Sequence, residues 1–327
     1  MARMLRKSVL EATQKATQSK ALKKITAGYE LLPPAEHGIR YILWAADSAH
    51  AKPTPAKAQD EEVAATKSAP KPFRDPFSKE NLEEELFVTR LHDSHNLVLN
   101  KFNVVDEHVV LPTIEFAPQE EPLTAADFRA LWTAMRGLDG FAFFNCGYES
   151  GASQPHKHMQ LMSYPSMKEV TGLDMVRLDP PPLLHFINQR LRDYSTTETV
   201  QLPELPFCHF LHRIDVPEDT ESGEASATLL TIYEKVLRQM NDTPYPVAAA
   251  QPPSSSPLPV AYNLLLTSSF LFLIPRKTQS FHGIEVNSIG FIGSFFVRSD
   301  EQRAFFASHG GPMELLRQVT FPPIPSK

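Results

Sequence analysis

The feature that most constrains this chain is a strand–loop–strand unit at residues 140–164. The apolar run GFAFFNCG is followed by a turn of small residues, YESGASQP, and then by the segment HKHMQLMSY. Short apolar and aromatic runs bounded by small and polar residues are typical of strands. Because side chains alternate faces along a strand, His156, His158 and Gln160 are expected to project together from one face of a sheet.

Further strands are expected on both sides of this unit. Three short runs rich in β-branched and aromatic residues precede it, at 85–91, 95–102 and 108–116, and they lie close enough in sequence to pair antiparallel. In the C-terminal part, the stretches 260–275 and 284–297 are expected to form a hairpin of long strands.

Three segments carry the spacing of amphipathic helices. The first, 124–140, opens with Thr124 as an N-cap and Asp127 three residues later, and its apolar residues recur at helical spacing. The segments 183–195 and 225–240 show the same periodicity. Strands in series with helices packed against them indicate an α+β fold.

Two stretches divide the chain. Residues 52–72 are rich in Ala, Pro and charge and have almost nothing to bury, so a mobile surface loop is expected there. Residues 241–259 carry so many prolines and serines that neither a helix nor a central strand is expected. With 42% hydrophobic residues among 327, we expect one compact catalytic unit built from a front half, 1–200, and a back half, 201–327.

Charge and cysteine content limit the partners and the compartment. A formal net charge of −6 and a pI near 6.1 argue against a general nucleic-acid binder. The apolar runs are shorter than the roughly 20 residues that a membrane-spanning helix needs, so no membrane partner is expected. Cys146 and Cys208 are too few for a disulfide framework, which favours the cytoplasm or the nucleus. The basic N-terminus is expected to form a solvated leading helix, and a targeting role for it stays open.

Four kinds of chemistry could use two histidines and a glutamine on one face. Zinc needs three or four ligands, and glutamine is a poor third beside two imidazoles, so a metal site is disfavoured. A serine nucleophile would need the GxSxG spacing, which GYESGAS lacks. The histidines could simply pack and hydrogen-bond within a sheet. The fourth alternative is nucleotidyl transfer, in which an imidazole nitrogen attacks the α-phosphorus of a nucleotide.

The loop before the histidines favours nucleotidyl transfer. The small side chains of residues 151–153 let backbone N–H groups approach phosphate oxygens. His158, in the middle of the triplet, is expected to be the nucleophile, and His156 to position it or the phosphates. Gln160 can donate hydrogen bonds but cannot pass on a proton, so it favours leaving groups that are already stable anions, such as polyphosphates.

The segment FAFFNCGYESGASQPHKHMQ resembles the active-site segment of the diadenosine tetraphosphate phosphorylases, also called ATP adenylyltransferases. These enzymes are a branch of the histidine triad (HIT) superfamily in which the HxHxH motif has become HxHxQ. The stretches DPFSKENLEEELFV, HNLVLNKFNVV, YNLLLTSSFLFLIPRK and EVNSIGFIGSFFV also resemble the family, so the likeness covers most of the chain.

The resemblance implies a fold and a reaction. The fold is a HIT-like antiparallel sheet with packed helices, extended by a C-terminal half. The reaction is reversible phosphorolysis of diadenosine tetraphosphate with phosphate to ATP and ADP. In it, the histidine matching His158 is adenylylated, ATP departs, and phosphate attacks the intermediate to yield ADP. The expected partners are therefore small molecules, namely a dinucleoside polyphosphate, phosphate, ATP and ADP, and the protein could be a monomer or a homodimer.

The resemblance also implies a set of substrate-binding residues. Contacts to the nucleotide and its phosphates around His158 are expected from Asn145, Gly151, Ala152, Ser153, Gln154 and Gln160. Asn100 and Lys101 match a position for ribose and phosphate contacts, and Lys52 resembles an early lysine that reaches the polyphosphate. From the back half, the candidates that face the substrate are Asn263, Thr267, Arg276, Lys277 and Asn287.

Charge on the substrate is expected to be offset locally, by Lys52, Lys101 and Arg276. No covalent cofactor and no protein-bound metal are expected, and Mg²⁺ arriving with the nucleotide stays open. Seven other histidines lack comparable spacing and are expected to be structural or solvated: His92, His95, His108, His209, His212, His282 and His309.

Three alternatives stay open. A hexose-1-phosphate uridylyltransferase-like enzyme also places glutamine after a histidine nucleophile, but its usual HPH is HKH here. A catalytically inactive nucleotide-binding or RNA-cap-binding module is disfavoured because His156, His158 and Gln160 are all present. A hydrolase is disfavoured by Gln160. The stretch TSSF departs from relatives, which often carry a charged or aromatic residue after the threonine, and this leaves the pocket of the second nucleotide open.

Overall fold

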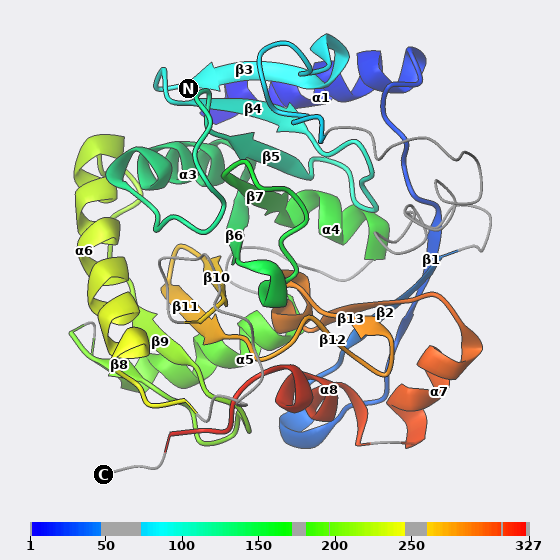
Figure 1. Ribbon diagram of the computed structural model, residues 1–327, viewed down its shortest axis with the longest axis vertical. Coiled ribbons are helices and arrows are strands. Elements are labelled where there is room, and N and C mark those ends of the chain that lie inside the picture. Colours follow the sequence, from blue (N-terminus) through cyan, green and yellow to red (C-terminus); the bar gives the residue numbers. More distant parts are fainter. Residues whose placement is uncertain are drawn as a thin grey trace.

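The computed structural model describes residues 2–46, 73–171, 181–195, 197–245, 260–308 and 310–324. Within these residues the centre of the molecule is a sheet of nine strands in the order β3-β4-β5-β7-β6-β10-β11-β9-β8 (Figure 1), and every neighbouring pair is antiparallel. The strands are β3 Phe87–Leu91, β4 His95–Leu99, β5 Val109–Pro112, β6 Gly140–Cys146, β7 His158–Ser163, β8 Thr199–Val200, β9 Phe210–Arg213, β10 Tyr262–Leu266 and β11 Phe270–Pro275.

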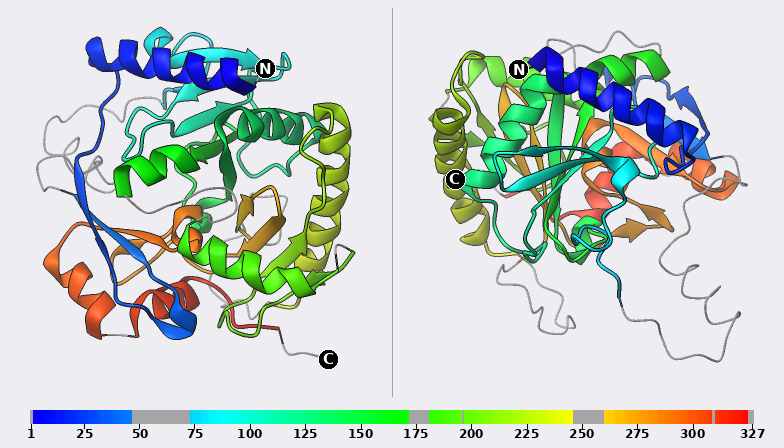
Figure 2. Two further views of the ribbon diagram at one scale, coloured as in Figure 1. Left: turned by 180° about the vertical axis from the view of Figure 1, so that it is seen from behind. Right: turned by 90° about the horizontal axis from the view of Figure 1, so that it is seen from above.

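Helices cover both faces of this sheet. One face carries α1 (Ala2–Gln18), α3 (Ala125–Leu138) and α6 (Ser222–Asn241), and α3 packs against both of the others. Figure 2 shows α3 and α6 on one side of the strands and the C-terminal elements on the other. The mixture of helices with an antiparallel sheet confirms the α+β prediction.

The second face is covered by more varied elements. They are α4 (Tyr164–Thr171), α5 (Pro182–Arg190), α7 (Asp300–Ser308), α8 (Gly311–Val319) and a small sheet of β1 (Ala27–Leu31), β2 (Ile42–Ala46) and β14 (Ser294–Val297). A two-stranded ribbon, β12 (Ser280–Phe281) with β13 (Ile284–Glu285), and the 3₁₀ turn Ser288–Ile292 join the main sheet to β14. None of the helices in the described part of the chain combines the length and the apolar composition that crossing a bilayer requires.

The alternation of side chains along β6 and β7 divides the core in two. On β6, Phe141 and Phe143 pack toward α5 and β14, while Ala142 and Phe144 pack toward α3 and α6. On β7, Gln160 and His158 share the face of Met162, which belongs to the α5 side. The predicted common face is therefore present for His158 and Gln160, whereas His156 precedes β7 and lies in an isolated bridge with Pro118.

The sheet repeats one topology. The succession β4-β5-α3-β6-β7 is followed along the chain by β8-β9-α6-β10-β11, and the two units meet where β6 pairs with β10. The repeat is one of topology, and the polar residues of β7 are not repeated in the second unit. On the face where β7 carries His158 and Gln160, β11 carries the buried residues Phe270, Phe272 and Ile274.

The predicted helix at 124–140 is present and is capped as expected. Thr124 accepts a hydrogen bond from the N–H of Asp127, and the Asp127 carboxylate accepts one from the N–H of Thr124, which forms a capping box. The helix ends at Asp139, which takes a left-handed conformation (φ 50°), rather than at Gly137 or Gly140.

Three predictions about segments need correction or comment. The stretch 284–297 is not a long strand: it forms β13, a 3₁₀ turn and β14, because Asn287 caps the turn and Gly293 (φ 88°) ends it. The hairpin is made within 260–275 by β10 and β11. The leading helix exists, but it is not solvated all round, since Val9 is fully buried. The predicted loop at 52–72 and most of the break at 241–259 lie outside the described residues.

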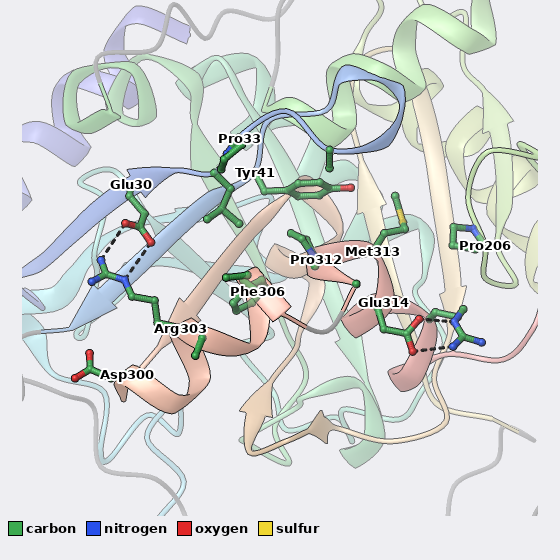
Figure 3. A pocket seen from close by; sticks show the side chains of 17 residues that line it. Glu30, Pro33, Tyr41, Pro206, Asp300, Arg303, Phe306, Pro312, Met313 and Glu314 are labelled. Atoms are coloured by element: carbon green, nitrogen blue, oxygen red, sulfur yellow. Dashed lines mark hydrogen bonds and ion pairs between the residues drawn. The ribbon is translucent and has the colours of Figure 1, made fainter.

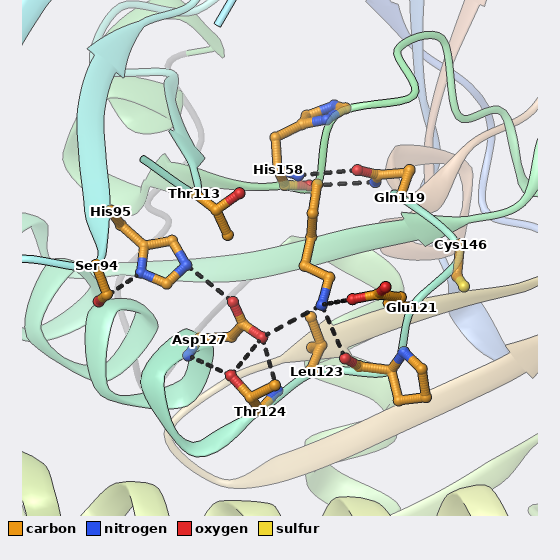
Figure 4. Close-up of polar contacts among 12 residues, drawn as sticks. Ser94, His95, Thr113, Gln119, Glu121, Leu123, Thr124, Asp127, Cys146 and His158 are labelled. Atoms are coloured by element: carbon orange, nitrogen blue, oxygen red, sulfur yellow. Dashed lines mark hydrogen bonds and ion pairs between the residues drawn. The ribbon is translucent and has the colours of Figure 1, made fainter. Parts of the chain in front are cut away.

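A buried polar network lies on the α3 side of β7, opposite the ring of His158 (Figure 4). Lys157, 2% exposed, donates to the carbonyl of Pro122 at 3.0 Å, and its Nζ lies 3.9 Å from Oδ2 of Asp127. Oδ1 of Asp127 lies 2.8 Å from Nε2 of His95. Burial alone would raise the pKa of Asp127, but the hydrogen bond and charge of His95, the charge of Lys157 and the N–H of Thr124 outweigh it and lower that pKa.

We expect Asp127→Asn to destabilise the fold by about 3 kcal/mol at neutral pH, because it leaves the buried ammonium of Lys157 without its carboxylate. The folded pKa of Asp127 lies below its ordinary 3.8, so its stabilisation is present above that pH and is lost as pH falls through the folded value. Urea unfolding at several pH values would measure the effect. A difference between wild type and variant that stays constant with pH would contradict it.

The matched control is Glu121→Gln. The Glu121 carboxylate lies 3.7 Å from Nζ of Lys157 but is half exposed, and exposed ion pairs contribute little. Its stability should stay close to that of the wild type at all pH values.

Candidate active site

A cavity of about 540 Å³ lies beside the polar face of β7 and is lined by both halves of the chain. The front half contributes Asn100, His108, Asn145, His158 and Gln160, together with Gly151, Ser153 and Gln154 from the loop before β7. The back half contributes Asn287 and Arg298. Most of the predicted site residues around the nucleophile are thus brought together in one concave surface.

The cavity also has an apolar part. It is formed by Trp44 of β2, Met162 of β7 and Phe295 and Phe296 of β14, among others. The indole N–H of Trp44 donates to the hydroxyl of Ser294 at 2.8 Å, which fixes the ring against the small sheet. A ligand in this cavity would therefore find a polar end beside β7 and an apolar end beside β2 and β14.

His158 is held in a defined tautomer. Its Nδ1 lies 2.8 Å from the backbone carbonyl oxygen of His156. A carbonyl can only accept, so Nδ1 carries the proton, and in the neutral ring the lone pair is on Nε2. His158 lines the cavity although it is only 6% exposed. This is the arrangement that a nitrogen nucleophile needs.

Gln119, which the sequence did not single out, fixes the backbone of the nucleophile. Its side-chain oxygen accepts from the N–H of His158 at 2.8 Å, and its amide donates to the carbonyls of His158 (3.2 Å) and Asn145 (2.8 Å). Gln119 is 1% exposed. It therefore joins the end of β6 to the start of β7, where the two strands separate around the loop. Figure 4 shows its contacts with His158.

The ring of His156 is anchored to the protein. Its Nε2 donates to the carbonyl of Thr113 at 2.9 Å, and its Nδ1 lies 2.7 Å from the carboxylate of Asp75. Both ring nitrogens are therefore engaged by side-chain or backbone oxygens of the chain itself. The part of His156 that contacts the ring of His158 through a hydrogen bond is its backbone carbonyl.

His108 was expected to be structural or solvated, and this prediction is wrong: it lines the cavity and contacts Gln160. Asn100 uses its side-chain oxygen to accept from the N–H of Phe102, so its amide nitrogen faces the His108 ring, 3.3 Å from Nδ1 and 3.2 Å from Nε2. The Gln160 oxygen can only accept, so Nε2 of His108 donates to it at 2.9 Å, and Nδ1 of the neutral ring is left to accept from the Asn100 nitrogen. Gln160 is thereby oriented with its N–H groups available to the cavity.

The loop before β7 depends on glycine. Gly151 has φ 87°, which an L-residue with a Cβ rarely adopts, and a Cβ there would lie 2.9 Å from Cβ of Asn287 and 3.3 Å from the carbonyl of Val286. Gly151 thus lets the loop approach the back half closely, and this contact closes one wall of the cavity.

Asn145 is oriented by three donors. Its side-chain oxygen accepts from the amide of Asn263 (2.8 Å) and from the N–H (3.1 Å) and hydroxyl (2.7 Å) of Ser288. Asn145 lines the cavity, and with its oxygen occupied, its amide nitrogen is the group left for a ligand. Asn263 is fully buried and acts behind Asn145 rather than at the cavity surface.

Arg276 lies behind the cavity and not on its surface. The guanidinium is buried and donates to the carbonyls of Val319, Thr278 and Val286 and to the side-chain oxygen of Asn263. Burial lowers the pKa of Arg276 to about 9, against an opposing effect of the charge of Glu149. The prediction that Arg276 faces the substrate is replaced by a supporting role, because its donors are used by the backbone around it.

The structure does not bring four other predicted residues into the cavity lining. Thr267 caps the β10–β11 turn by accepting a hydrogen bond from the N–H of Phe270. It therefore lies at the end of β10 away from the cavity, since Asn263, at the other end, pairs with the cavity residue Asn145. Lys101 pairs with Glu83 at 2.6 Å, outside the lining. Lys277 is exposed, and Ala152 is half-buried. Lys52 lies outside the described residues.

Arg298 is a cation that the sequence reasoning missed. It lines the cavity from the back half, and its guanidinium pairs with the carboxylate of Glu285 at 3.2 Å. Among the described lining residues it is the one Lys or Arg. No local motif marks it, since it follows an ordinary strand.

Other candidates for chemistry are structural. Cys146 and Cys208 are buried, and desolvation raises the pKa of each thiol to about 12, so both stay protonated at neutral pH. His209 is fully buried and donates to the carbonyl of Phe207; burial lowers its pKa to about 4. Over the described ranges, no three His, Cys, Asp or Glu side chains gather as a metal-binding group.

A second cavity, of about 1050 Å³, lies between β1, α7 and α8 and shares no lining residue with the first. Figure 3 shows Tyr41, Phe306, Pro312 and Met313 in its middle. An ion pair stands at each end, Arg303 with Glu30 and Arg317 with Glu314. None of the residues predicted for the site lines it.

Comparisons with known proteins agree on one family. Residues 1–178 match the model of the Ap4A phosphorylase N-terminal domain, and residues 203–322 match the ATP adenylyltransferase C-terminal domain, where Ap4A is diadenosine tetraphosphate. The chain belongs to the Ap4A phosphorylase family. This confirms the resemblance found in the sequence.

Individual relatives come from Saccharomyces cerevisiae. Diadenosine 5',5'''-P1,P4-tetraphosphate phosphorylase 2 is 30% identical over 255 residues, covering 73% of this chain and 73% of the relative. Protein APA1 is 28% identical over 249 residues, covering 69% of this chain and 70% of the relative. The crystal structure of yeast Ap4A phosphorylase Apa2 has a TM-score of 0.73 at 23% identity, over 99% of this chain and 96% of that one. Its complex with Ap4A has a TM-score of 0.71 at 23% identity, over 98% of both chains. The HIT-like fold is thereby confirmed.

We expect His108→Phe to lower kcat about tenfold or more, because the ring keeps its volume but no longer fixes the Gln160 amide. Steady-state kinetics with diadenosine tetraphosphate would measure kcat and KM separately. His185→Phe, on α5 outside the cavity lining, is the control. A His108 variant with unchanged kcat would show that the orientation of Gln160 does not depend on His108.

We expect Gly151→Ala to raise KM for the nucleotide about tenfold, since the positive φ alone costs about 1–2 kcal/mol and the Cβ pushes against Asn287. Gly223→Ala is the matched control: a Cβ there meets nothing within 4 Å, and the residue lies in the first turn of α6. Equal KM values for the two variants would contradict the role assigned to the loop.

Proposed function

We propose that the protein catalyses the reversible phosphorolysis of diadenosine tetraphosphate to ATP and ADP, through an AMP adduct on His158. The observation that carries this proposal is the hydrogen bond from Nδ1 of His158 to the His156 carbonyl. It places the lone pair of the neutral ring on Nε2, at the wall of a cavity whose polar lining includes amides, His108, a glycine turn and the Arg298–Glu285 pair.

In the first half-reaction, Nε2 of His158 attacks the α-phosphorus of one adenylate unit. The bond to the bridging oxygen breaks, and ATP leaves with the electron pair. The imidazole becomes positively charged, and its Nδ1–H remains directed at the His156 carbonyl, which stabilises the new charge. In the second half-reaction, an oxygen of phosphate attacks the same phosphorus, the P–N bond breaks, and ADP and neutral His158 are formed.

Neither step needs a proton. ATP is a stable anion when it leaves, and phosphate attacks as an anion, so a glutamine that donates hydrogen bonds suffices beside the nucleophile. We assign the non-bridging oxygens of the reacting phosphorus to the amide of Gln160 and to the N–H groups of the loop 151–154. We assign the more distant phosphates to Arg298, and the adenine base to the apolar end beside Trp44.

The polar lining is compatible with a polyanionic substrate. It provides the neutral donors Asn100, Asn145 and Gln160, and its described charged residues are Arg298 and Glu285, which pair with each other. We propose that substrate binding competes with the Arg298–Glu285 pair. Lys52, outside the described residues, remains a candidate for a further phosphate contact.

Incubation of the purified protein with diadenosine tetraphosphate, with and without phosphate, tests the proposal. We expect ATP and ADP in the presence of phosphate and little turnover without it, resolved by ion-exchange chromatography. ATP with AMP in the absence of phosphate would indicate a hydrolase, and no turnover would indicate a binding module. Exchange of a hexose 1-phosphate would indicate the uridylyltransferase alternative.

His158→Ala should abolish turnover, since no other described side chain in the lining supplies an imidazole lone pair in the same position. Denaturing mass spectrometry after incubation with the dinucleotide alone should detect one AMP unit per chain on the wild type and none on the variant. Full activity of His158→Ala would remove the nucleophile assignment.

A further inference from the structure

The segment 73–83, which precedes β3, lies against the histidine pair. Asp75 places its carboxylate 2.7 Å from Nδ1 of His156, as described above. The Phe77 ring lies 5.2 Å from the ring of His158, centroid to centroid, and 5.8 Å from that of His156 in an edge contact. One short segment therefore contacts both histidines, and it does so from a part of the chain that no catalytic motif marks.

The position of Phe77 is fixed by local hydrogen bonds. The carboxylate of Asp75 accepts from the N–H of Phe77 at 2.9 Å, and the amide of Asn81 donates to the carbonyl of Asp75 (2.9 Å) and to the hydroxyl of Ser78 (3.0 Å). Asp75 thus binds both His156 and the backbone of Phe77. The aromatic ring is consequently tied to the same carboxylate that anchors the histidine pair.

Phe77 contacts the nucleophile without lining the cavity. The lining includes His158 and Gln160 but not Phe77, and His158 is only 6% exposed. The ring of His158 therefore faces the substrate cavity on one side and is packed by Phe77 on another. An apolar ring in this place removes solvent from beside the imidazole and offers no hydrogen bond to a water molecule.

This placement bears on the fate of the AMP adduct. Phosphate and water can both attack the phosphorus bound to Nε2. Attack by phosphate breaks the P–N bond and gives ADP; attack by water breaks the same bond, gives AMP and releases a proton. Water outnumbers dissolved phosphate by orders of magnitude, so a transferase has to keep water from the adduct.

We propose that Phe77 shields the adenylylated His158 from water and so sets the partition between phosphorolysis and hydrolysis. The proposal rests on the proposed function, because it concerns the intermediate of that reaction. In this proposal Phe77 influences whether phosphate or water attacks the adduct, and it takes no part in binding the nucleotide.

The test compares Phe77→Ala with Phe73→Ala. Phe73 is in the same segment, is 62% exposed, and undergoes the same loss of a phenyl ring. Each protein is given diadenosine tetraphosphate and a fixed concentration of phosphate, and ADP and AMP are quantified. We expect the AMP-to-ADP ratio to rise about tenfold in Phe77→Ala and to stay at the wild-type value in Phe73→Ala.

A second measurement covers the case in which Phe77→Ala does not fold. Phe77→Leu keeps an apolar side chain but not the flat ring, and the lifetime of its isolated AMP adduct in phosphate-free buffer is compared with that of the wild type. We expect the adduct to hydrolyse several times faster. This lifetime would not respond to a merely structural role once the adduct has formed.

An unchanged product ratio and an unchanged adduct lifetime in folded variants would overturn the shielding proposal while leaving phosphorolysis intact. An equal rise in Phe73→Ala would also overturn it, because the effect would then come from the segment and not from the ring over His158. Failure of the wild type to form an adduct would instead reject the proposed function, so the two failures are distinguishable.

Discussion

The hydrogen bond from Nδ1 of His158 to the carbonyl of His156 is the interaction on which the candidate site depends. In the proposed mechanism it decides which nitrogen attacks, and it stabilises the charge that the ring then acquires. The bond spans only two residues, but both of its ends need support from elsewhere. Gln119 holds the backbone of His158, and the Asp75 and Thr113 contacts hold the ring of His156. A local geometry is thus maintained by groups from three separate segments.

The two faces of β7 have different roles: one presents side chains to the cavity, and the other is packed against a buried polar network. One face presents His158 and Gln160 to the cavity. Lys157, which directly precedes His158, turns to the α3 side, where its ammonium meets the Pro122 carbonyl and the Asp127 carboxylate. Burying an ammonium is costly unless it is paired and hydrogen-bonded, so this network has to form whenever β7 takes its native register. A slip by one residue would place the lysine in the cavity and the histidine against α3. The buried charge therefore favours the register that exposes the nucleophile.

What the sequence could predict was local. The strand–loop–strand unit, the capped helix at 124–140 and the common face of His158 and Gln160 follow from periodicity and small residues within about twenty positions. The partners His108, Gln119, Asp75 and Arg298 lie between 39 and 140 positions away from His158, and no spacing rule connects them to it. Arg276 and Thr267 illustrate the opposite error. A polar residue after an apolar strand can face a ligand or can hydrogen-bond to nearby backbone groups. Arg276 does the second, because backbone carbonyls from distant segments pack around its guanidinium, and the sequence does not show them.

The composition of the cavity bears on reversibility. A polyphosphate held by many cations would be bound tightly and released slowly, whereas neutral amide donors stabilise the developing charge without retaining the product. The described lining is of the second kind: it offers amides, a glycine turn and an arginine that already has a carboxylate partner. Such a site has to rely on orientation more than on charge, and the Asn100–His108–Gln160 series supplies it by allowing the glutamine only one hydrogen-bonding direction. Because phosphate and ATP then meet the same fixed donors when they approach the adduct, the site can serve the reaction in both directions.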